Sequence, residues 1–457
     1  MPRGLLLSEG DVHRRNRSLI SPSFTFAKLQ GMAPLIARAA ARACRALAAP
    51  GGAPIDAHER MSNLTLYIIG LAAFGAEFEG LLPTALVGGE EAAPPPRVAA
   101  SAADAAGVHK SLAFLLDYML EMISNPLLLL PGGDALPLSR KAARLIGDLR
   151  GLAGGMIAAR RAARAAASAA AAAANTEPDD LLDALLDAEG GAGFSAGEVL
   201  DEALTFVLAG HETTAKALSW SLLLLAQHPA WAARVRSEAA VVLGPAPAAR
   251  LPTRDDVPRL PLLAATVQEA LRLYPPAPVV ARECVRDVEL AAGSPCALRV
   301  AAGTTLLIPV AALQRDEALW EEPHAFKPER WLLSGDEADA PPRFSATACL
   351  KHPLAFAAFS HGPRNCIGAG FAQLEAKLIL AVLVSRLEWE VLDSYQHMPN
   401  MAITLRPLHG MPMVFRALGG APPLAPRGSP KARCEGAEER GGRGAAALAE
   451  EEQGKKG

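Results

Sequence analysis

The most constraining feature of this chain is a short loop that presents one cysteine. It reads Phe359-Ser-His-Gly-Pro-Arg-Asn-Cys-Ile-Gly368. Its first glycine permits a tight turn with positive φ, and Gly368 has no side chain to keep a flat cofactor away from the backbone. Apolar side chains three and four positions apart predict a helix over residues 369–386, which places Cys366 at a helix N-terminus. Helix amides, the helix dipole and nearby Arg364 are expected to favour the ionised sulfur.

The spacing Phe-x-x-Gly-x-Arg-x-Cys-x-Gly closely resembles the haem-binding signature of the cytochrome P-450 superfamily, the haem-thiolate monooxygenases. A lone cysteine is usually only a small buried hydrophobe, so the flanking pattern carries this inference. The resemblance implies that Cys366 is the thiolate ligand of haem b iron, which helps a bound O–O bond to break. It also implies that Arg364 pairs with a haem propionate, that Phe359 packs beside the sulfur and that Gly368 lies against the cofactor.

A second motif, Ala209-Gly-His-Glu-Thr-Thr214, lies in a long helix predicted over residues 197–227. Glycine in mid-helix costs about 0.5–1 kcal/mol relative to alanine, so the motif needs a compensating reason. The resemblance implies that Ala209 and Gly210 let this helix pass over the haem and open a kink that admits dioxygen. It also implies that Thr213 hydrogen-bonds the oxygen and that Glu212 feeds protons, because the second oxygen atom leaves as water only after two protonations. The alternative is a bent core helix whose threonine bonds back to a carbonyl.

Two other segments resemble haem-holding parts of the family. Residues 4–24 resemble a helix that normally lies far from the start of the protein. There His13 and Arg17, four apart on one face, are expected to donate a hydrogen bond and to pair with a propionate. The alternative is a basic, solvated helix face. Arg282 follows a proline-rich turn as a third expected propionate partner, and an exposed strand arginine is its alternative. Pro278 to Ala281 are expected to border the substrate.

Three charged residues predict a structural cluster. Glu269 and Arg272 share a face of a predicted helix, which alone is weak evidence. Arg330 resembles the family's arginine that closes a Glu-Arg-Arg cluster, and such a buried cluster fixes geometry more than it adds stability. These residues are therefore assigned to folding and haem retention. Gln314 stands where the family commonly has histidine, and its amide is still able to donate a hydrogen bond.

Composition limits the remaining choices. The 457 residues are 51% hydrophobic and 20% charged with a net charge of −3, which predicts a soluble globular chain with a sizeable core and no nucleic-acid partner. The six cysteines lack metal-type spacing, as expected for reduced thiols in an intracellular protein. No apolar run reaches the roughly 18 residues of a membrane span. Residues 88–107 predict a flexible insertion, and residues 395–415 predict a hairpin that enters the substrate pocket.

The sequence thus predicts a mainly α fold with a minor β portion, in which haem lies between the long central helix and the cysteine loop. The expected domain spans residues 1–418, and residues 419–457 are expected to be a disordered tail. Because the family motifs start so early, we expect an N-terminally truncated gene product whose full-length form associates with a membrane. That membrane is expected to be the cytosolic face of the endoplasmic reticulum, or else a plastid.

The expected reaction inserts one atom of O₂ into a hydrophobic organic substrate of lipid, sterol or terpenoid type. Electrons are expected from NADPH through a reductase, or from a ferredoxin, because the cofactor does the difficult chemistry. Two alternatives remain. One is a haem-thiolate isomerase or peroxygenase, although such members usually lose the acid–threonine pair that is retained here as Glu212 and Thr213. The other is an inactive or merely haem-binding truncated product.

Overall fold

The computed structural model describes residues 3–48, 53–78, 98–100, 102–128, 130–170, 180–333 and 342–419. The predicted mainly α fold with a minor β portion is confirmed. The helices are α1 (Gly10–Ile20), α2 (Phe26–Leu47), α3 (Ala57–Phe74), α4 (Ala102–Ser124), α5 (Pro137–Ala170), α6 (Leu181–Asp187), α7 (Ala196–Gln227), α8 (Pro229–Leu243), α9 (Pro261–Leu273), α10 (Val310–Leu313) and α11 (Ala369–Arg386). Residues 1–419 cluster as one unit, and the predicted tail lies outside the described residues.

The strands form small sheets. They are β1 (Ile55–Asp56), β2 (Ala76–Phe78), β3 (Val98–Ala100), β4 (Val280–Glu283), β5 (Val288–Leu290), β6 (Leu298–Val300), β7 (Thr305–Ile308), β8 (Leu332–Leu333), β9 (Arg343–Phe344), β10 (Leu387–Val391), β11 (Pro399–Met401), β12 (Leu405–Pro407) and β13 (Pro412–Ala417). The widest sheet has the order β1-β13-β10, with Trp389 opposite Phe415. β11 and β12 pair as an antiparallel hairpin, as expected for this part of the chain.

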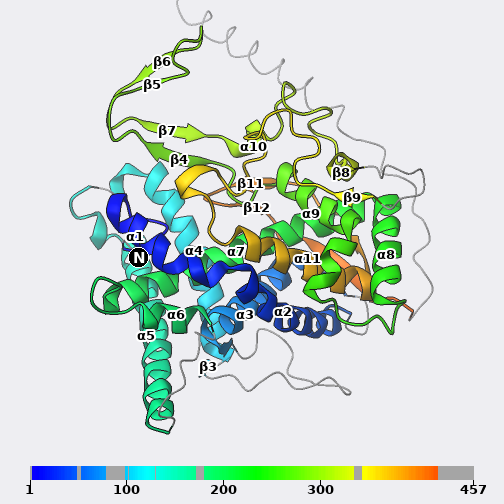
Figure 1. The fold of residues 1–457 in the computed structure, drawn as a ribbon, viewed down its shortest axis with the longest axis horizontal. Helices are drawn as coiled ribbons and strands as arrows, with labels where there is room; N and C mark the ends of the chain where they lie inside the picture. Colours follow the sequence, from blue (N-terminus) through cyan, green and yellow to red (C-terminus); the bar gives the residue numbers. More distant parts are fainter. Residues whose placement is uncertain are drawn as a thin grey trace, which may run out of the picture. The chain divides into compact units, whose positions relative to one another are not determined.

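Helix α7 is the structural centre of the described chain. A capping box begins this helix. The Ser195 hydroxyl accepts a hydrogen bond from the Glu198 amide, and the Glu198 carboxylate accepts one from the Ser195 amide. Most of its side chains are buried, including Trp220. In Figure 1, α7 lies in the middle of the ribbon beside α3 and α11, while the β5–β6 hairpin extends away from it at the top. The predicted boundaries of α7 and α11 are confirmed to within one residue.

One prediction is wrong in part. The alanine-rich stretch of residues 88–107 was expected to be a flexible insertion, but its second half is regular. Residues 98–100 form β3, and α4 begins at Ala102. Alanine has the highest helix propensity, so a stretch that looks low in complexity can still continue as helix. Residues 88–97 lie outside the described part of the chain.

Gly210 has a packing role in the contact between α3 and α7. A Cβ atom at this position would lie 2.8 Å from both Cδ1 and Cγ1 of Ile69 on α3, which is too close for unstrained contact. One residue further along, the Thr65 hydroxyl donates to the His211 carbonyl at 2.9 Å. The glycine therefore lets the two helices approach each other. The backbone of α7 is assigned as α-helix on both sides of Gly210, and the expected local kink there stays a prediction.

Replacing Gly210 by alanine should destabilise the protein by about 1–3 kcal/mol through overpacking against Ile69. This cost exceeds the roughly 1 kcal/mol that alanine gains over glycine in a helix interior. Denaturant unfolding measures the difference. The control is Gly151→Ala in α5, where a new Cβ meets nothing within 4 Å and should stabilise the protein slightly. Adding Ile69→Ala to Gly210→Ala should restore part of the loss, and no restoration would contradict the packing role.

Candidate cofactor site

The cysteine loop is closed by its own backbone. The Cys366 amide donates to the Phe359 carbonyl at 2.9 Å, and the Asn365 amide donates to the Gly362 carbonyl at 3.0 Å. Gly362 has a φ of +76°, as expected for the tight turn, and a β-carbon would strain this conformation. Phe359 is half-buried and packs against the hydrophobic core. The loop is thus rigid at both ends, while the Cys366 side chain remains exposed.

The environment of the Cys366 sulfur differs from the expectation. Burial raises the pKa of the thiol, and the amide of Gly368 and the charge of Arg17 offset this only in part. The Gly368 amide at the helix N-terminus lowers the pKa as expected, but burial outweighs it, so the pKa of the free thiol is raised and the expected ionised form is not favoured. The sulfur is reachable yet surrounded by protein, so it is poorly hydrated and its neutral form is favoured. Coordination to a metal would ionise the Cys366 thiol.

A stack of aromatic rings connects α7 to the cysteine loop. Phe206 of α7 stacks on Phe24 with ring centroids 5.6 Å apart. A Cβ at Gly368 would lie 3.8 Å from the Phe24 ring and 4.0 Å from the Cys366 sulfur. Gly368 thus has room around it and borders the sulfur. Phe24 was not singled out from the sequence, because an aromatic residue after a serine-proline turn carries no specific signal.

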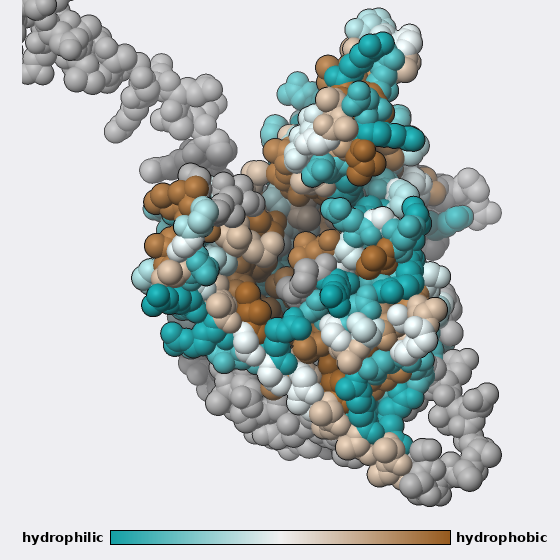
Figure 2. Space-filling model, turned by 90° about the vertical axis from the view of Figure 1, so that its left-hand side faces the viewer, coloured by the Kyte–Doolittle hydropathy of each residue, from teal (hydrophilic) through white to brown (hydrophobic). Residues whose placement is uncertain are grey.

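Ala209 and Thr213 share the α7 face that carries Phe206, since the three lie three and four residues apart. Ala209 is exposed although the helix around it is buried, and Thr213 is half-buried. The Thr213 hydroxyl donates to the Ala209 carbonyl at 2.9 Å, which is the back-bonding considered as the alternative from sequence. An exposed alanine in the middle of a core helix indicates open space beside it. Figure 2 shows one face of the molecule hollowed, with hydrophobic surface on its sides.

Three arginines and a histidine gather beside the loop. Arg17 donates to the Asn365 carbonyl at 2.8 Å, and Arg282 donates to the Ser360 hydroxyl at 3.2 Å. Burial, with the charges of Arg282 and Arg17, lowers the pKa of Arg364. Burial, with the charges of Arg364 and Arg17, lowers the pKa of His13 and keeps its ring neutral. Such mutual repulsion is relieved by an anion, and two carboxylates of one ligand suit this set.

These features fit haem. No group of three or more His, Cys, Asp or Glu in the described ranges is arranged to hold a metal ion. A metal at Cys366 must therefore bring its other ligands with it, as iron in a porphyrin does. The basic cluster of His13, Arg17, Arg282 and Arg364 suits the propionates, and the exposed Ala209 leaves room for a flat ring on the opposite side.

Glu212 lies in an ion pair that sequence reasoning did not include. Its carboxylate accepts from the Lys216 ammonium one turn later, and His211 Nε2 lies 3.7 Å away. Burial raises the pKa of Glu212, but the charges of Lys216 and His211 outweigh burial and hold the pKa at about 2. The carboxylate is therefore ionised at neutral pH. The signal in the sequence was a lysine four residues after the glutamate, in an otherwise apolar helix.

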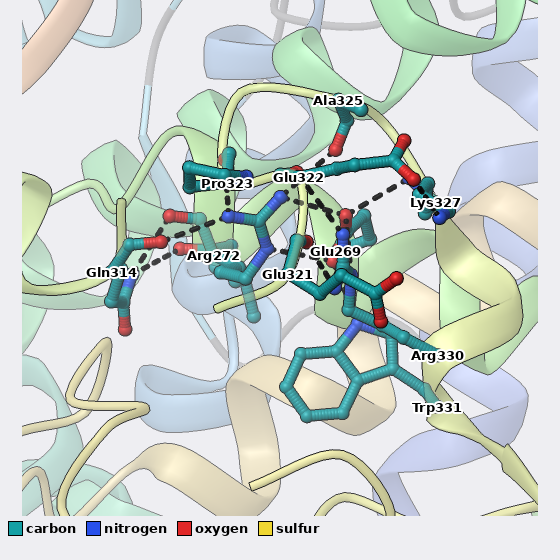
Figure 3. Close-up of polar contacts among 11 residues, drawn as sticks. Glu269, Arg272, Gln314, Glu321, Glu322, Pro323, Ala325, Lys327, Arg330 and Trp331 are labelled. Atoms are coloured by element: carbon teal, nitrogen blue, oxygen red, sulfur yellow. Dashed lines mark hydrogen bonds and ion pairs between the residues drawn. The ribbon is translucent and has the colours of Figure 1, made fainter. Parts of the chain in front are cut away.

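The predicted charged cluster forms around Glu269. Its carboxylate accepts from Arg272 at 2.8 and 2.9 Å, from Arg330 at 3.2 Å and from the Trp331 indole at 2.9 Å. The Arg272 guanidinium reaches further, to the carbonyls of Gln314, Pro323 and Ala325. Figure 3 shows Arg272 between Gln314 on one side and Glu269 on the other.

Gln314 connects this cluster to the cysteine loop. It is fully buried, and its amide nitrogen donates to the carbonyls of Leu271 and Arg272 at 3.0 and 2.9 Å. Its amide oxygen accepts from the Ala357 backbone at 2.7 Å, two residues before Phe359. The position noted as a departure from the family pattern therefore fixes the approach to the loop. Its role was partly visible in the sequence, because an amide can donate and accept at once.

The fold and this donor set are those of a helical protein suited to holding haem through a cysteine sulfur. The model of the cytochrome P450 family matches residues 1–411, and the chain belongs to that family. Membership implies haem with a cysteine thiolate ligand. Within the described residues, no helix is both long and apolar enough to cross a membrane.

Several similar curated proteins come from plants. Cytochrome P450 734A5 of Oryza sativa subsp. japonica is 38% identical over 228 residues, which is 50% of this chain and 39% of the relative. A cytokinin hydroxylase of Arabidopsis thaliana is 30% identical over 421 residues, 91% of this chain and 72% of the relative. An 11-oxo-beta-amyrin 30-oxidase of Glycyrrhiza uralensis is 29% identical with the same coverage. The chain thus matches about two fifths of the length of the first relatives.

Replacing Gln314 by leucine should lower the free energy of unfolding by at least about 3 kcal/mol, because one amide and two carbonyls lose their partner. Thermal or denaturant unfolding measures this loss. Gln314→His is the matched variant, since imidazole keeps one donor and one acceptor, and its loss should be smaller. Equal losses in the two variants would show that the hydrogen bonds of Gln314 do not stabilise the fold.

Proposed function

We propose that this chain forms the haem-binding part of a monooxygenase that inserts one atom of O₂ into a hydrophobic organic substrate. The observation that carries the proposal is the accessible Cys366 sulfur in a poorly hydrated position, which Gly368 and Phe24 connect to Phe206 on α7. Haem supplies the redox chemistry when it is bound, and the protein supplies the ligand, the binding groups and the shaped space.

Each residue of the site has a distinct task in this proposal. Cys366 would provide the thiolate ligand, and the basic cluster would hold the propionates. Ala209 leaves room over the ring, since any larger side chain would fill it. The Thr213 hydroxyl uses its hydrogen on the Ala209 carbonyl, so its lone pairs are free to accept from a water or an oxygen-bearing ligand in the hollow. Phe359 and Phe24 keep water away from the sulfur side.

Glu212 acts in the proposal as an ionised relay rather than as a store of protons. With a pKa of about 2 the carboxylate accepts a proton only transiently and returns it at once. A carboxylate whose folded-state pKa is lowered contributes stability above its unfolded pKa of about 4.3, and this contribution is lost as the pH falls toward 2. The Glu212 carboxylate is therefore ionised throughout the neutral range.

The relatives named cytokinin hydroxylase and 11-oxo-beta-amyrin 30-oxidase support a hydroxylation or oxidation of an organic substrate. The proposal further assigns a substrate of lipid, sterol or terpenoid type, with electrons from NADPH through a reductase or from a ferredoxin. It also includes association with a membrane, at the endoplasmic reticulum or in a plastid. The ion-paired state of Glu212 favours one second candidate, a haem-thiolate isomerase or peroxygenase. Such an enzyme needs no protons delivered for O₂ cleavage. NADPH consumption in the presence of a plant reductase separates the two.

The protein reconstituted with haem, reduced and exposed to carbon monoxide should show the red-shifted Soret band of a thiolate complex. Cys366→Ala should lose this band, because the axial sulfur is gone. Cys349→Ala is the control, since Cys349 is a half-buried thiol whose pKa burial raises to about 11, and its band should persist. Absence of the band in the parent protein, or its survival in Cys366→Ala, would overturn the assignment.

Thr213→Ala should keep the carbon monoxide band but divert a larger share of NADPH electrons to hydrogen peroxide, because no hydroxyl remains to direct proton transfer. An effect of about 10²-fold on the ratio of product to peroxide is the lower end for a positioned proton-transfer group. Thr213→Ser retains the hydroxyl and should stay close to the parent. Unchanged coupling in Thr213→Ala would exclude this role.

A further inference from the structure

Glu202 is a fully buried carboxylate near the start of α7. Its Oε2 atom accepts from the Leu5 amide at 3.0 Å, and its Oε1 atom accepts from the Asn16 side-chain amide at 3.0 Å. Burial raises the pKa of Glu202 to about 7, the charges of Asp201 and Glu198 act in the same direction, and the two hydrogen bonds offset this only in part. A charged group is costly to bury unless it is hydrogen-bonded. The contacts to Leu5 and Asn16 are therefore what keeps a carboxylate at this position.

Asn16 is the buried side chain through which Glu202 holds α1. It has no exposed surface. Its amide nitrogen donates to Glu202 and to the Arg3 carbonyl, each at 3.0 Å, and its amide oxygen accepts from the Arg15 guanidinium at 2.9 and 3.1 Å. Both the donor and the acceptor of this side chain therefore have partners, which determines its orientation.

Arg15 makes a second connection between the same two helices. Its guanidinium donates to the carboxylate of Glu198, which lies one turn before Glu202 on α7. This ion pair is partly exposed, so it contributes little by itself. It nevertheless directs the same turn of α1 toward α7.

The segment before α1 is seated on α7 at the same place. A Cβ atom at Gly4 would overlap the Thr205 hydroxyl and would lie 3.0 Å from the Asp201 carbonyl oxygen, so only glycine allows this approach. The Arg3 amide donates to the Asp201 carboxylate at 3.3 Å. Residues 3–5 thus present backbone amides to two neighbouring carboxylates of α7.

The turn of α1 that Glu202 holds also contacts the cysteine loop. Arg17, the residue after Asn16, donates to the carbonyl and the side-chain oxygen of Asn365 at 2.8 and 2.5 Å, directly before the cysteine. His13 is buried one turn earlier, on the face of α1 that carries Asn16. Two successive residues of α1 therefore connect α7 to the loop, and they lie among the α1 members of the basic cluster.

We propose that Glu202 and Asn16 are positioning residues for the cofactor: their hydrogen bond holds α1 against α7 and so fixes the α1 part of the basic cluster where the propionates would bind. Neither residue needs to touch the cofactor, because both act through His13 and Arg17. This inference rests on the proposed function, because it needs haem beside the cysteine loop. Its consequence is slow release of haem, which is separate from turnover.

The rate of haem release tests the inference without any substrate. The haem-loaded protein is mixed with excess apomyoglobin at pH 8, where the Glu202 carboxylate is ionised, and haem transfer is followed by absorbance. Glu202→Gln should release haem at least about tenfold faster than the parent, because the new amide has one acceptor for two donors. Asn16→Asp should act similarly, because it places two carboxylates against each other. Asn16→Ala is the milder variant if Asn16→Asp does not fold, and it should also release haem faster.

The double variant Glu202→Gln with Asn16→Asp exchanges donor and acceptor. The new amide still accepts from Leu5 and donates to the new carboxylate, so release should return to within about threefold of the parent. Both exchanges keep the size of the side chain, so a role in packing alone predicts no change in either single variant. Thr266→Val is the control: it removes the acceptor of the buried Trp231 indole between α8 and α9, and it should lower stability without speeding haem release.

Two results would overturn this inference alone, in a parent protein that shows the red-shifted carbon monoxide band. One is release at the parent rate from the single variants, and the other is a double variant that releases haem as fast as they do. Absence of that band in the parent protein would instead refute the proposed function, and this inference with it.

Discussion

One buried carboxylate, Glu269, holds together the part of the fold that presents the cofactor ligand. Removing a carboxylate from water costs several kcal/mol, and Glu269 recovers this through donors from two guanidinium groups, an indole and the Lys327 backbone amide. Those donors come from α9 and from the segment that ends at Trp331. Gln314 extends the hydrogen-bond network to Ala357, in the segment that leads into the cysteine loop. The sulfur is therefore fixed from outside the loop as well as by the loop's own hydrogen bonds.

The two sides of the proposed cofactor site differ in charge and polarity. On the side of the cysteine loop, the cationic Arg17, Arg282 and Arg364 gather and the sulfur is poorly hydrated, so an anionic ligand with a metal would suit both. On the side of α7, the side chains are apolar or small, and Glu212 and Lys216 form an ion pair with each other. A hydrophobic molecule can lie there without uncovering an unpaired charge. This division is what a flat, dianionic cofactor with an apolar substrate above it requires.

The bounds of the main helices and the position of the cysteine loop were predictable, because short-range sequence patterns determine them. The periods of apolar residues gave α7 and α11 almost to the residue, and the spacing of Gly362, Arg364 and Cys366 gave the loop. The resemblance to the family's Glu-Arg-Arg cluster also predicted correctly that Glu269, Arg272 and Arg330 form a cluster. Other features lay beyond a local pattern. The raised pKa of Cys366 depends on burial by surrounding parts of the chain, and the packing role of Gly210 depends on Ile69 of another helix; both are neighbours distant in the sequence.

The sequence by itself determined the class of fold, and it predicts which cysteine is the sulfur ligand and which residues hold haem and move protons. These follow from residue type, spacing and helix period, which are local properties. Only the tertiary structure decided that Lys216 reaches the hairpin at Thr404 and that Phe24 bridges α7 and Gly368. Each of these contacts joins segments far apart in the chain, and only packing sets which side chains of such segments meet.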